Sequence, residues 1–252
     1  MIQRDITLQA NGINIEGRLY LPGRGERTSY PAMCICHGIP SGNPPDPNDG
    51  GYPAFAERIC NEGFAVFIFN FRGTGESGGN IDMMGWTSDL KAVIDYLCTL
   101  PVIDKDNLTL LGFSAGAAVS VCVASQDKRI SAVVACACPA AFNFADPSSL
   151  IDRFRNIGAI RDSNFPESVE QWKKDFNAVR PIDRVAGFSP GQLLIVHGNQ
   201  DDVVDVSQAY KMYAEATEPK NLIIVDGATH RLRQNERAMA IVIDWLKSER
   251  LN

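Results

Sequence analysis

Apolar residues are arranged in two different ways along this chain. Near the start they alternate with polar residues over 2–8 and 13–21, as in strands with one buried face. From residue 31 onward they form short, nearly continuous runs, and a stretch with helical periodicity follows each run. These runs are residues 31–37, 64–70, 107–113, 130–138, 192–197 and 221–226. Because strands buried on both faces of a parallel sheet have this pattern, the sequence predicts an α/β protein in which two antiparallel strands lead into six strand–helix units.

One connection is much longer than the others. Residues 139–189 separate two of the predicted strands, whereas such links usually have only a few residues. Apolar residues at helical spacing in 150–160 and 169–176 predict two short helices within it. We interpret residues 140–178 as a small helical cap over one end of the sheet. We expect the chain, 1–252, to form a single domain with this cap as an insertion.

Charge and hydrophobicity exclude two kinds of partner. The 24 Lys and Arg residues are outnumbered by 30 Asp and Glu residues, so the net charge is −6. A nucleic-acid partner is not expected, because binding to phosphates requires clustered Lys and Arg. The most apolar stretch, 130–145, is too short for a membrane span, and residues 1–10 lack the apolar core of a signal peptide. We therefore expect a cytoplasmic protein without a membrane span.

The seven cysteines predict neither a disulfide framework nor a metal site. Their number is odd, and most of them lie within the apolar runs, where buried, reduced thiols are expected. Cys34 and Cys36, like Cys136 and Cys138, are two residues apart, which is not the C-x-x-C spacing of a zinc site. We expect no bound metal.

Residues 112–116 read Gly-Phe-Ser-Ala-Gly and lie between a predicted strand and a predicted helix. In a G-x-S-x-G turn, small residues two places on either side of the serine permit a sharp, strained bend. The bend exposes the serine hydroxyl at the amino end of the helix, where developing negative charge is favoured. Ser114 is therefore the candidate nucleophile.

A serine nucleophile needs a base and an acid that orients the base. Of the three histidines, His37 and His197 each end a predicted strand, whereas His230 lies in the loop after the last strand. His230 is the predicted base, and we expect the other two to brace loops. The acid comes from the loop that follows His197, where Asp201 and Asp202 are both candidates.

These features resemble the α/β-hydrolase fold family, in which the catalytic residues follow the order Ser, Asp or Glu, then His. The resemblance covers essentially the whole chain and implies a mostly parallel, twisted eight-stranded sheet flanked by helices, with the cap inserted after strand six. The family pattern G-x-x-D-x-x-V matches Gly198, Asp201 and Val204, which favours Asp201 over Asp202. The resemblance also implies an oxyanion hole made by the backbone N–H groups of Ala115 and Ile39, because Pro40 has no N–H.

Two other motifs compete with this interpretation. Residues 73–78 match the dinucleotide-binding pattern G-x-G-x-x-G, but they follow the fourth strand and no helix begins directly after them. The resemblance assigns residues 71–77 to a tight loop beside the nucleophile instead. A metal site built from the three histidines lacks any recognised ligand spacing.

The predicted activity is cofactor-free acyl transfer by Ser114, His230 and Asp201 on a small-molecule acyl substrate. We expect a carboxylesterase for small or medium acyl groups, a preference that comes from the resemblance alone. The alternatives are a thioesterase, a small peptidase, a lyase or cofactor-free peroxidase on the same fold, and a binding protein on a hydrolase scaffold. A homo-oligomer is compatible with the sequence, which gives no signal for it.

The cap supplies the candidate substrate pocket. Aromatic residues that could form an apolar wall are Phe142, Phe144, Phe154 and Trp172. Each could equally pack the cap onto the sheet. The cap residues Arg153, Arg155 and Arg161 could meet an anionic group, but nearby acidic residues favour a solvated surface.

Overall fold

A computed structural model describes residues 1–23, 28–43, 46–142 and 146–250, with the Arg250 side chain left undescribed. Within these residues the chain forms one eight-stranded sheet in the order β1-β2-β4-β3-β5-β6-β7-β8. The strands are β1 (Ile2–Ala10), β2 (Ile13–Leu21), β3 (Tyr30–Cys36), β4 (Ala65–Phe69), β5 (Ile103–Phe113), β6 (Ile130–Cys136), β7 (Gln192–Gly198) and β8 (Lys220–Val225). The first two strands pair antiparallel with each other, and β2 pairs antiparallel with β4. The other pairs are parallel, as the sequence predicts.

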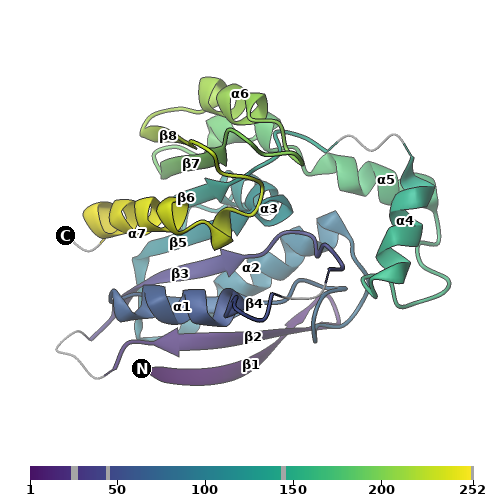
Figure 1. Cartoon of the computed structure of the whole chain (residues 1–252). Helices are drawn as coiled ribbons and strands as arrows, with labels where there is room; N and C mark the ends of the chain where they lie inside the picture. Colours follow the sequence, from purple (N-terminus) through teal and green to yellow (C-terminus); the bar gives the residue numbers. More distant parts are fainter. Residues whose placement is uncertain (24–27, 44–45, 143–145, 251–252) are drawn as a thin grey trace.

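Helices cover both faces of the sheet (Figure 1). They are α1 (Gly51–Asn61), α2 (Met83–Thr99), α3 (Ala115–Ala124), α4 (Pro147–Asn156), α5 (Val169–Ala178), α6 (Ser207–Glu215) and α7 (Glu236–Arg250), with the short 3₁₀ helices η1 (Pro181–Asp183), η2 (Val185–Gly187) and η3 (Leu232–Gln234). Helices α1 and α7 pack on one face, and α2, α3 and α6 pack on the other.

The two faces have separate hydrophobic cores because successive side chains of a strand point to opposite faces. In β3, Cys34 and Cys36 belong to the core under α2 and α3, whereas Met33 and Ile35 belong to the core under α1 and α7. All of these side chains are buried, which explains why the strands read as continuous apolar runs. The cysteines among the described residues are free thiols, and only Cys98 is more than slightly exposed.

The cap helices α4 and α5 follow β6 and lie at one end of the sheet (Figure 1). They fall within the interval 140–178 that the sequence assigns to a cap. The indole N–H of Trp172 donates to the carbonyl oxygen of Ile81 at 3.0 Å, and the backbone N–H of Ile81 donates to Ala159 at 2.8 Å. Arg161 donates to the carbonyl oxygens of Gly75 and Ser77 at 2.7 and 2.6 Å. The cap is therefore joined to the segment 75–81 that leads into α2.

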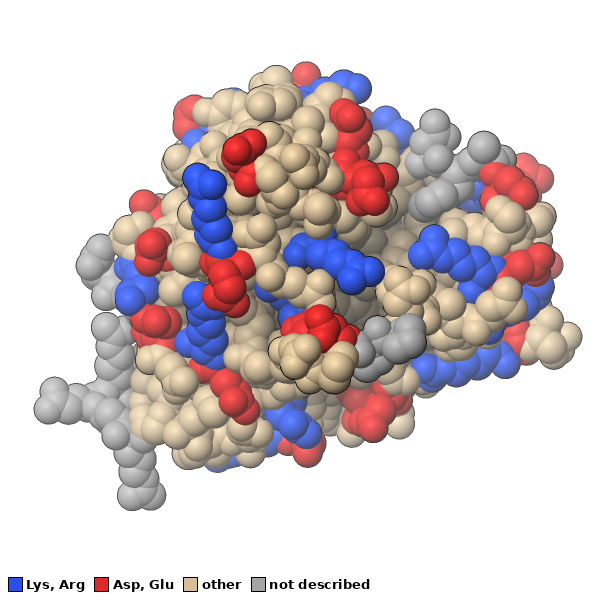
Figure 2. All heavy atoms as spheres, in the orientation of Figure 1, with Lys and Arg blue, Asp and Glu red and all other residues tan. Residues whose placement is uncertain are grey.

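Acidic and basic side chains alternate over the face drawn in Figure 2, with no extended basic patch on that face. Many charged groups form ion pairs at the surface, such as Arg129 with Asp95 at 2.8 Å. In the described part of the chain, no helix has both the length and the hydrophobicity that crossing a membrane requires.

Candidate active site

Ser114 occupies the tight turn between β5 and α3. Its φ of 52° and ψ of −122° are strained for a residue with a side chain. A Cβ atom on Gly112 would collide with the backbone of Ala117, and one on Gly116 would collide with the carbonyl group of Cys36. The glycines of the G-x-S-x-G motif are thus a steric requirement of this turn, which leaves Ser114 partly exposed at the carboxyl end of the sheet.

His230 and Asp201 reach Ser114 from two other loops at the same end of the sheet. The Nε2 atom of His230, in the loop after β8, lies 3.0 Å from the Oγ atom of Ser114. Its Nδ1 atom lies 2.8 and 3.0 Å from the two carboxylate oxygens of Asp201, in the loop after β7. Because a carboxylate only accepts hydrogen bonds, Nδ1 carries the proton and Nε2 is free to accept the serine hydroxyl proton. The structure therefore brings Ser114, His230 and Asp201 together in one continuous chain of hydrogen bonds.

The Asp201 carboxylate is buried and accepts hydrogen bonds from several donors. Its Oδ1 atom accepts the backbone N–H groups of Val203 and Val204 at 2.9 and 2.8 Å. Burial opposes ionisation, but hydrogen bonds from His197, His230 and these two N–H groups outweigh it and hold the pKa of Asp201 below its usual range. The carboxylate is thus ionised at neutral pH and faces His230 as an anion.

The other candidate acid and the strand-end histidine of β7 have different positions. Asp202 is exposed, and the contacts to His230 come from Asp201. His197 is fully buried, with its Nε2 atom 2.8 Å from the carbonyl oxygen of Val204 and 3.2 Å from the Oδ2 atom of Asp201. His197 thus braces the loop that holds the acid.

The two predicted oxyanion donors are the residue after Ser114 and the residue after Gly38. Ala115 is the first residue of α3, where backbone N–H groups have no partner within the helix. Ile39 follows β3 in a loop that packs against the nucleophile: a Cβ atom on Gly38 would lie 3.0 Å from the Cβ atom of Ser114. Their role as donors to an oxyanion stays a prediction.

The predicted pocket residues of the cap are buried against one another. The rings of Phe154 and Trp172 meet edge to face with centroids 6.0 Å apart, and Phe142 meets Phe176 edge to face at 5.2 Å. These contacts account for their burial as packing within the cap. Phe144 lies outside the described residues. That these rings line a substrate pocket stays a prediction.

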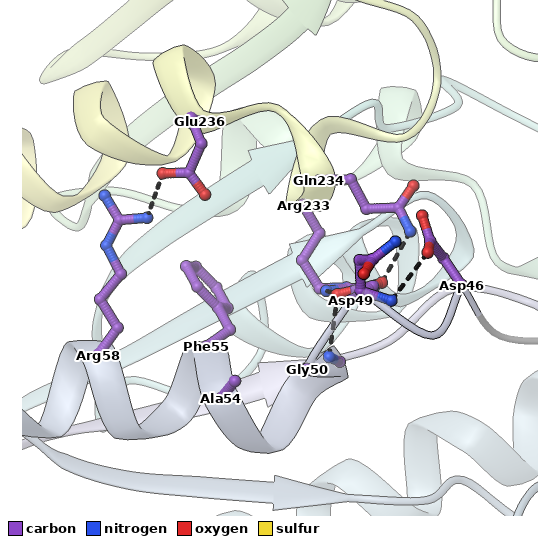
Figure 3. Close-up of a pocket in the computed structure, with 11 residues that line it drawn as sticks. Asp46, Asp49, Gly50, Ala54, Phe55, Arg58, Arg233, Gln234 and Glu236 are labelled. Atoms are coloured by element: carbon purple, nitrogen blue, oxygen red, sulfur yellow. Dashed lines mark hydrogen bonds and ion pairs between the residues drawn. The ribbon is translucent and has the colours of Figure 1, made fainter.

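A cluster that the sequence analysis missed joins the loop after β3 to the segment after His230. A polar cavity of about 350 Å³ is lined by both segments (Figure 3). Arg233 forms a bidentate ion pair with Asp49, in which Nη1 of Arg233 lies 2.7 Å from Oδ1 of Asp49. The guanidinium also lies 4.9 Å from the ring centre of Tyr52. Burial raises the pKa of Tyr52 to about 12. No sequence pattern links Asp49 to Arg233, because they are 184 positions apart.

The Asp49–Arg233 pair predicts a pH-dependent contribution to stability. Hydrogen bonds from Arg233 hold the pKa of Asp49 below its usual range. A depressed pKa stabilises the folded state above the unfolded-state pKa of about 3.9, and this stabilisation is lost as the pH falls below that value. We expect Asp49→Asn to lower the free energy of unfolding by about 1–2 kcal/mol at pH 7. The deficit should shrink as urea denaturation is repeated at pH values from 5 down to 3, and a constant deficit would contradict this account.

Sheet order, flanking helices and the turn after β5 together define an α/β-hydrolase fold. The chain belongs to the prolyl oligopeptidase family, whose profile matches residues 54–249. The protein YfhR of Salmonella typhi is 31% identical over 175 residues, which cover 66% of this chain and 54% of YfhR. The chain thus spans about half the length of the curated relatives it matches.

Solved structures of several hydrolases have the same architecture as this chain. The α/β hydrolase GrgF from Penicillium sp. sh18 superposes with a TM-score of 0.78 and 19% identity, covering 100% of both chains. Est1E from Butyrivibrio proteoclasticus, solved with bound ferulic acid, has a TM-score of 0.74 and 18% identity, covering 98% of this chain and 99% of Est1E. At these identities, the likeness is one of fold.

Proposed function

We propose that this protein is a serine hydrolase that cleaves carboxylic esters by acyl transfer, with Ser114 as nucleophile, His230 as base and Asp201 as acid. The observation that carries the proposal is the continuous hydrogen-bonded row of these side chains, contributed by three separate loops. Membership of a peptidase family and the α/β-hydrolase fold support the same reaction class.

In the first step, Nε2 of His230 takes the proton of Ser114 while Oγ attacks the ester carbonyl. The Nδ1–H of the imidazole keeps its hydrogen bond to Asp201, and the ionised carboxylate of Asp201 stabilises the imidazolium that forms. The carbonyl oxygen becomes negative and accepts the backbone N–H groups of Ala115 and Ile39. Collapse of the intermediate releases the alcohol, which takes the proton from His230, and leaves an acyl group on Ser114.

In the second step, water replaces the alcohol. His230 removes a proton from the water as it attacks the acyl group, and then returns that proton to Ser114 Oγ when the acid leaves. No cofactor enters this scheme, because the nucleophile, base, acid and oxyanion donors all belong to the chain.

Leaving-group chemistry agrees with the ester preference that the resemblance implies. An alcohol leaves with less help from a proton donor than an amine does, so an ester makes the smaller demand on His230. The cap rings Phe142, Phe154 and Trp172 are the candidate walls for a small or medium acyl group. The family match favours a second candidate, hydrolysis of a short peptide by the same residues.

Hydrolysis of a substrate panel tests this proposal. The panel contains p-nitrophenyl esters of increasing acyl length, acyl-CoA thioesters and aminoacyl anilides, and a fluorophosphonate probe is applied in parallel. We expect ester turnover with a burst of one product per active site, and labelling of Ser114 by the probe. Preferred cleavage of the anilides would select the peptidase, and ester turnover with Ser114 unlabelled would exclude the proposed nucleophile.

A further inference from the structure

His37, the residue directly after β3, has a hydrogen-bond partner at each ring nitrogen. Its Nε2 atom lies 3.1 Å from the backbone nitrogen of Phe71. Its Nδ1 atom lies 2.7 Å from the carbonyl oxygen of Gly38. The ring is flanked by the aromatic rings of Phe71 and Trp86, with centroids 5.2 and 5.5 Å away.

These partners determine which nitrogen carries the proton. A backbone N–H can only donate, so the Nε2 atom facing Phe71 is the acceptor and carries no proton. The proton therefore lies on Nδ1, which donates to the carbonyl oxygen of Gly38. Burial lowers the pKa of His37, which favours this neutral form.

The Gly38 carbonyl and the Ile39 N–H belong to the same peptide unit. In a planar trans peptide, these two groups point in opposite directions. A donor that holds the carbonyl therefore also fixes the direction of the N–H. Gly38 lies directly against the nucleophile, because a Cβ atom there would be 3.0 Å from the Cβ and 3.7 Å from the Oγ of Ser114.

We propose that His37 is a positioning residue, whose Nδ1–H holds the Gly38–Ile39 peptide so that the Ile39 N–H is presented to the oxyanion. This inference rests on the proposed function. It names the group that orients one half of the oxyanion hole, and it assigns His37 no proton transfer.

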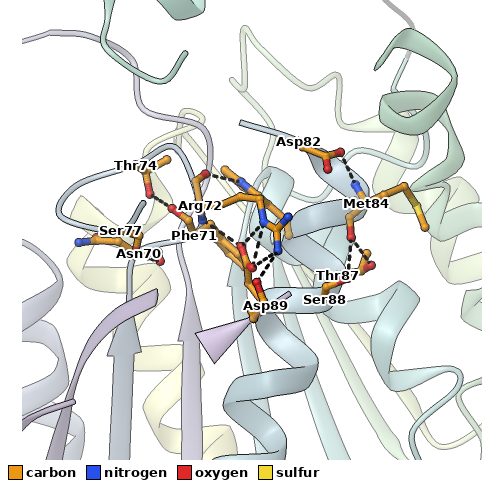
Figure 4. Close-up of polar contacts among 12 residues, drawn as sticks. Asn70, Phe71, Arg72, Thr74, Ser77, Asp82, Met84, Thr87, Ser88 and Asp89 are labelled. Carbon is orange, nitrogen blue, oxygen red and sulfur yellow. Dashed lines mark hydrogen bonds and ion pairs between the residues drawn. The ribbon is translucent and has the colours of Figure 1, made fainter. Parts of the chain in front are cut away.

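The loop that holds His37 is itself held by buried polar contacts (Figure 4). Asp89 on α2 is fully buried and accepts the Arg72 guanidinium at 2.7 and 3.0 Å and the Arg72 backbone N–H at 2.9 Å. The indole N–H of Trp86 donates to the Arg72 carbonyl oxygen at 3.1 Å. The hydroxyl of Thr74 donates to the Phe71 carbonyl oxygen at 2.7 Å and lies 3.1 Å from Nε2 of His37. The imidazole therefore lies against Phe71, which directly precedes the held residue Arg72, and against Thr74, the second residue of the segment that resembles a dinucleotide-binding motif.

Two substitutions of His37 separate its two hydrogen bonds. The amide of His37→Asn can place an N–H near the position of Nδ1 and keep the bond to Gly38. The longer side chain of His37→Gln reaches the position of Nε2, so it can accept from Phe71 but loses the Gly38 bond. We expect His37→Gln to lower kcat about a hundredfold with KM changed less than about twofold, and His37→Asn to stay within about tenfold of the wild type.

The kcat values are normalised to active sites titrated by the product burst, so that misfolded protein does not enter the comparison. Affinity for a boronic acid that forms a tetrahedral adduct with Ser114 should fall in parallel with kcat in His37→Gln, because that adduct also needs the oxyanion donor. Equal losses in the two variants, no loss in either, or a loss confined to KM would overturn the proposal.

A measurement on the wild-type protein keeps the test decisive if the variants fold poorly. The protein is prepared with ¹⁵N-labelled histidine for NMR. We expect the imidazole of His37 to be protonated at Nδ1 and unprotonated at Nε2. Its signals should not change when fluorophosphonate reacts with Ser114. A proton on Nε2 of His37 at pH 7 would overturn the proposal. Failure of the wild type to react with fluorophosphonate is a separate result, since it would remove the proposed function itself.

Discussion

Replacing Ser114 by alanine is expected to lower ester turnover by about 10⁴-fold or more. The Oγ atom is the only group that forms the acyl intermediate in the proposed reaction, and only binding and oxyanion stabilisation remain without it. The measurement is kcat for the best ester of the panel, with circular dichroism to check that the variant is folded. Alanine fits the turn because Ser114 already carries a Cβ atom at this strained φ of 52°, and alanine adds no further atom.

Ser125→Ala is the matched control for this substitution. Ser125 directly follows α3, eleven residues after Ser114, and its hydroxyl donates to the carbonyl oxygen of Cys122 at 2.9 Å. We expect this variant to keep wild-type kcat. Full turnover in Ser114→Ala would show that another residue is the nucleophile.

The second large effect concerns the acid. We expect Asp201→Asn to lower kcat by about 10³–10⁴-fold, because an amide lacks the negative charge that stabilises the imidazolium and can turn its N–H toward His230. The Asn oxygen can still accept the backbone N–H groups of Val203 and Val204, so the loop should keep its conformation. KM is expected to stay within a few-fold of the wild type, since the acid does not contact the substrate.

The neighbouring residue provides the control for this experiment. Asp202→Asn changes the same charge one position along the chain, at an exposed side chain. It should leave kcat within about twofold of the wild type, because a surface charge change away from the reacting groups has little effect. A larger loss in Asp202→Asn than in Asp201→Asn would reverse the assignment of the acid.

The strand pattern was predictable where apolar runs are continuous and less so at strand ends. The sequence predicts a strand over 107–113, but β5 begins at Ile103. The added residues 104–107 are polar and at most partly buried, so they form no apolar run in the sequence. The predicted strand 130–138 ends at Cys136, since Ala137 has a φ of 50° and leaves the strand conformation. Helix α4 ends at Asn156 rather than near 160, and Gly158 follows with a φ of 72°, a helix-ending conformation that glycine favours.

The candidate site was predictable where chemistry leaves a local motif. Ser114 has the glycine pattern, and His230 and Asp201 lie in loops after predicted strands, which meet at one edge of a parallel sheet. The Asp49–Arg233 pair and the hydrogen bond from Phe71 to His37 join distant segments without any periodic signal. Such contacts depend on how loops pack, which residue spacing alone does not encode.

Three short loops and one long insertion share the same edge of the sheet, and this division has a consequence for how relatives of this protein diversify. Ser114, Asp201 and His230 follow β5, β7 and β8, whereas the cap helices follow β6. Exchange of the segment after β6 between relatives would therefore change the cap and leave the three loops that carry Ser114, Asp201 and His230 as they are. Under the proposed function, selectivity and turnover would be encoded in separable stretches of the gene, so each could drift at its own pace.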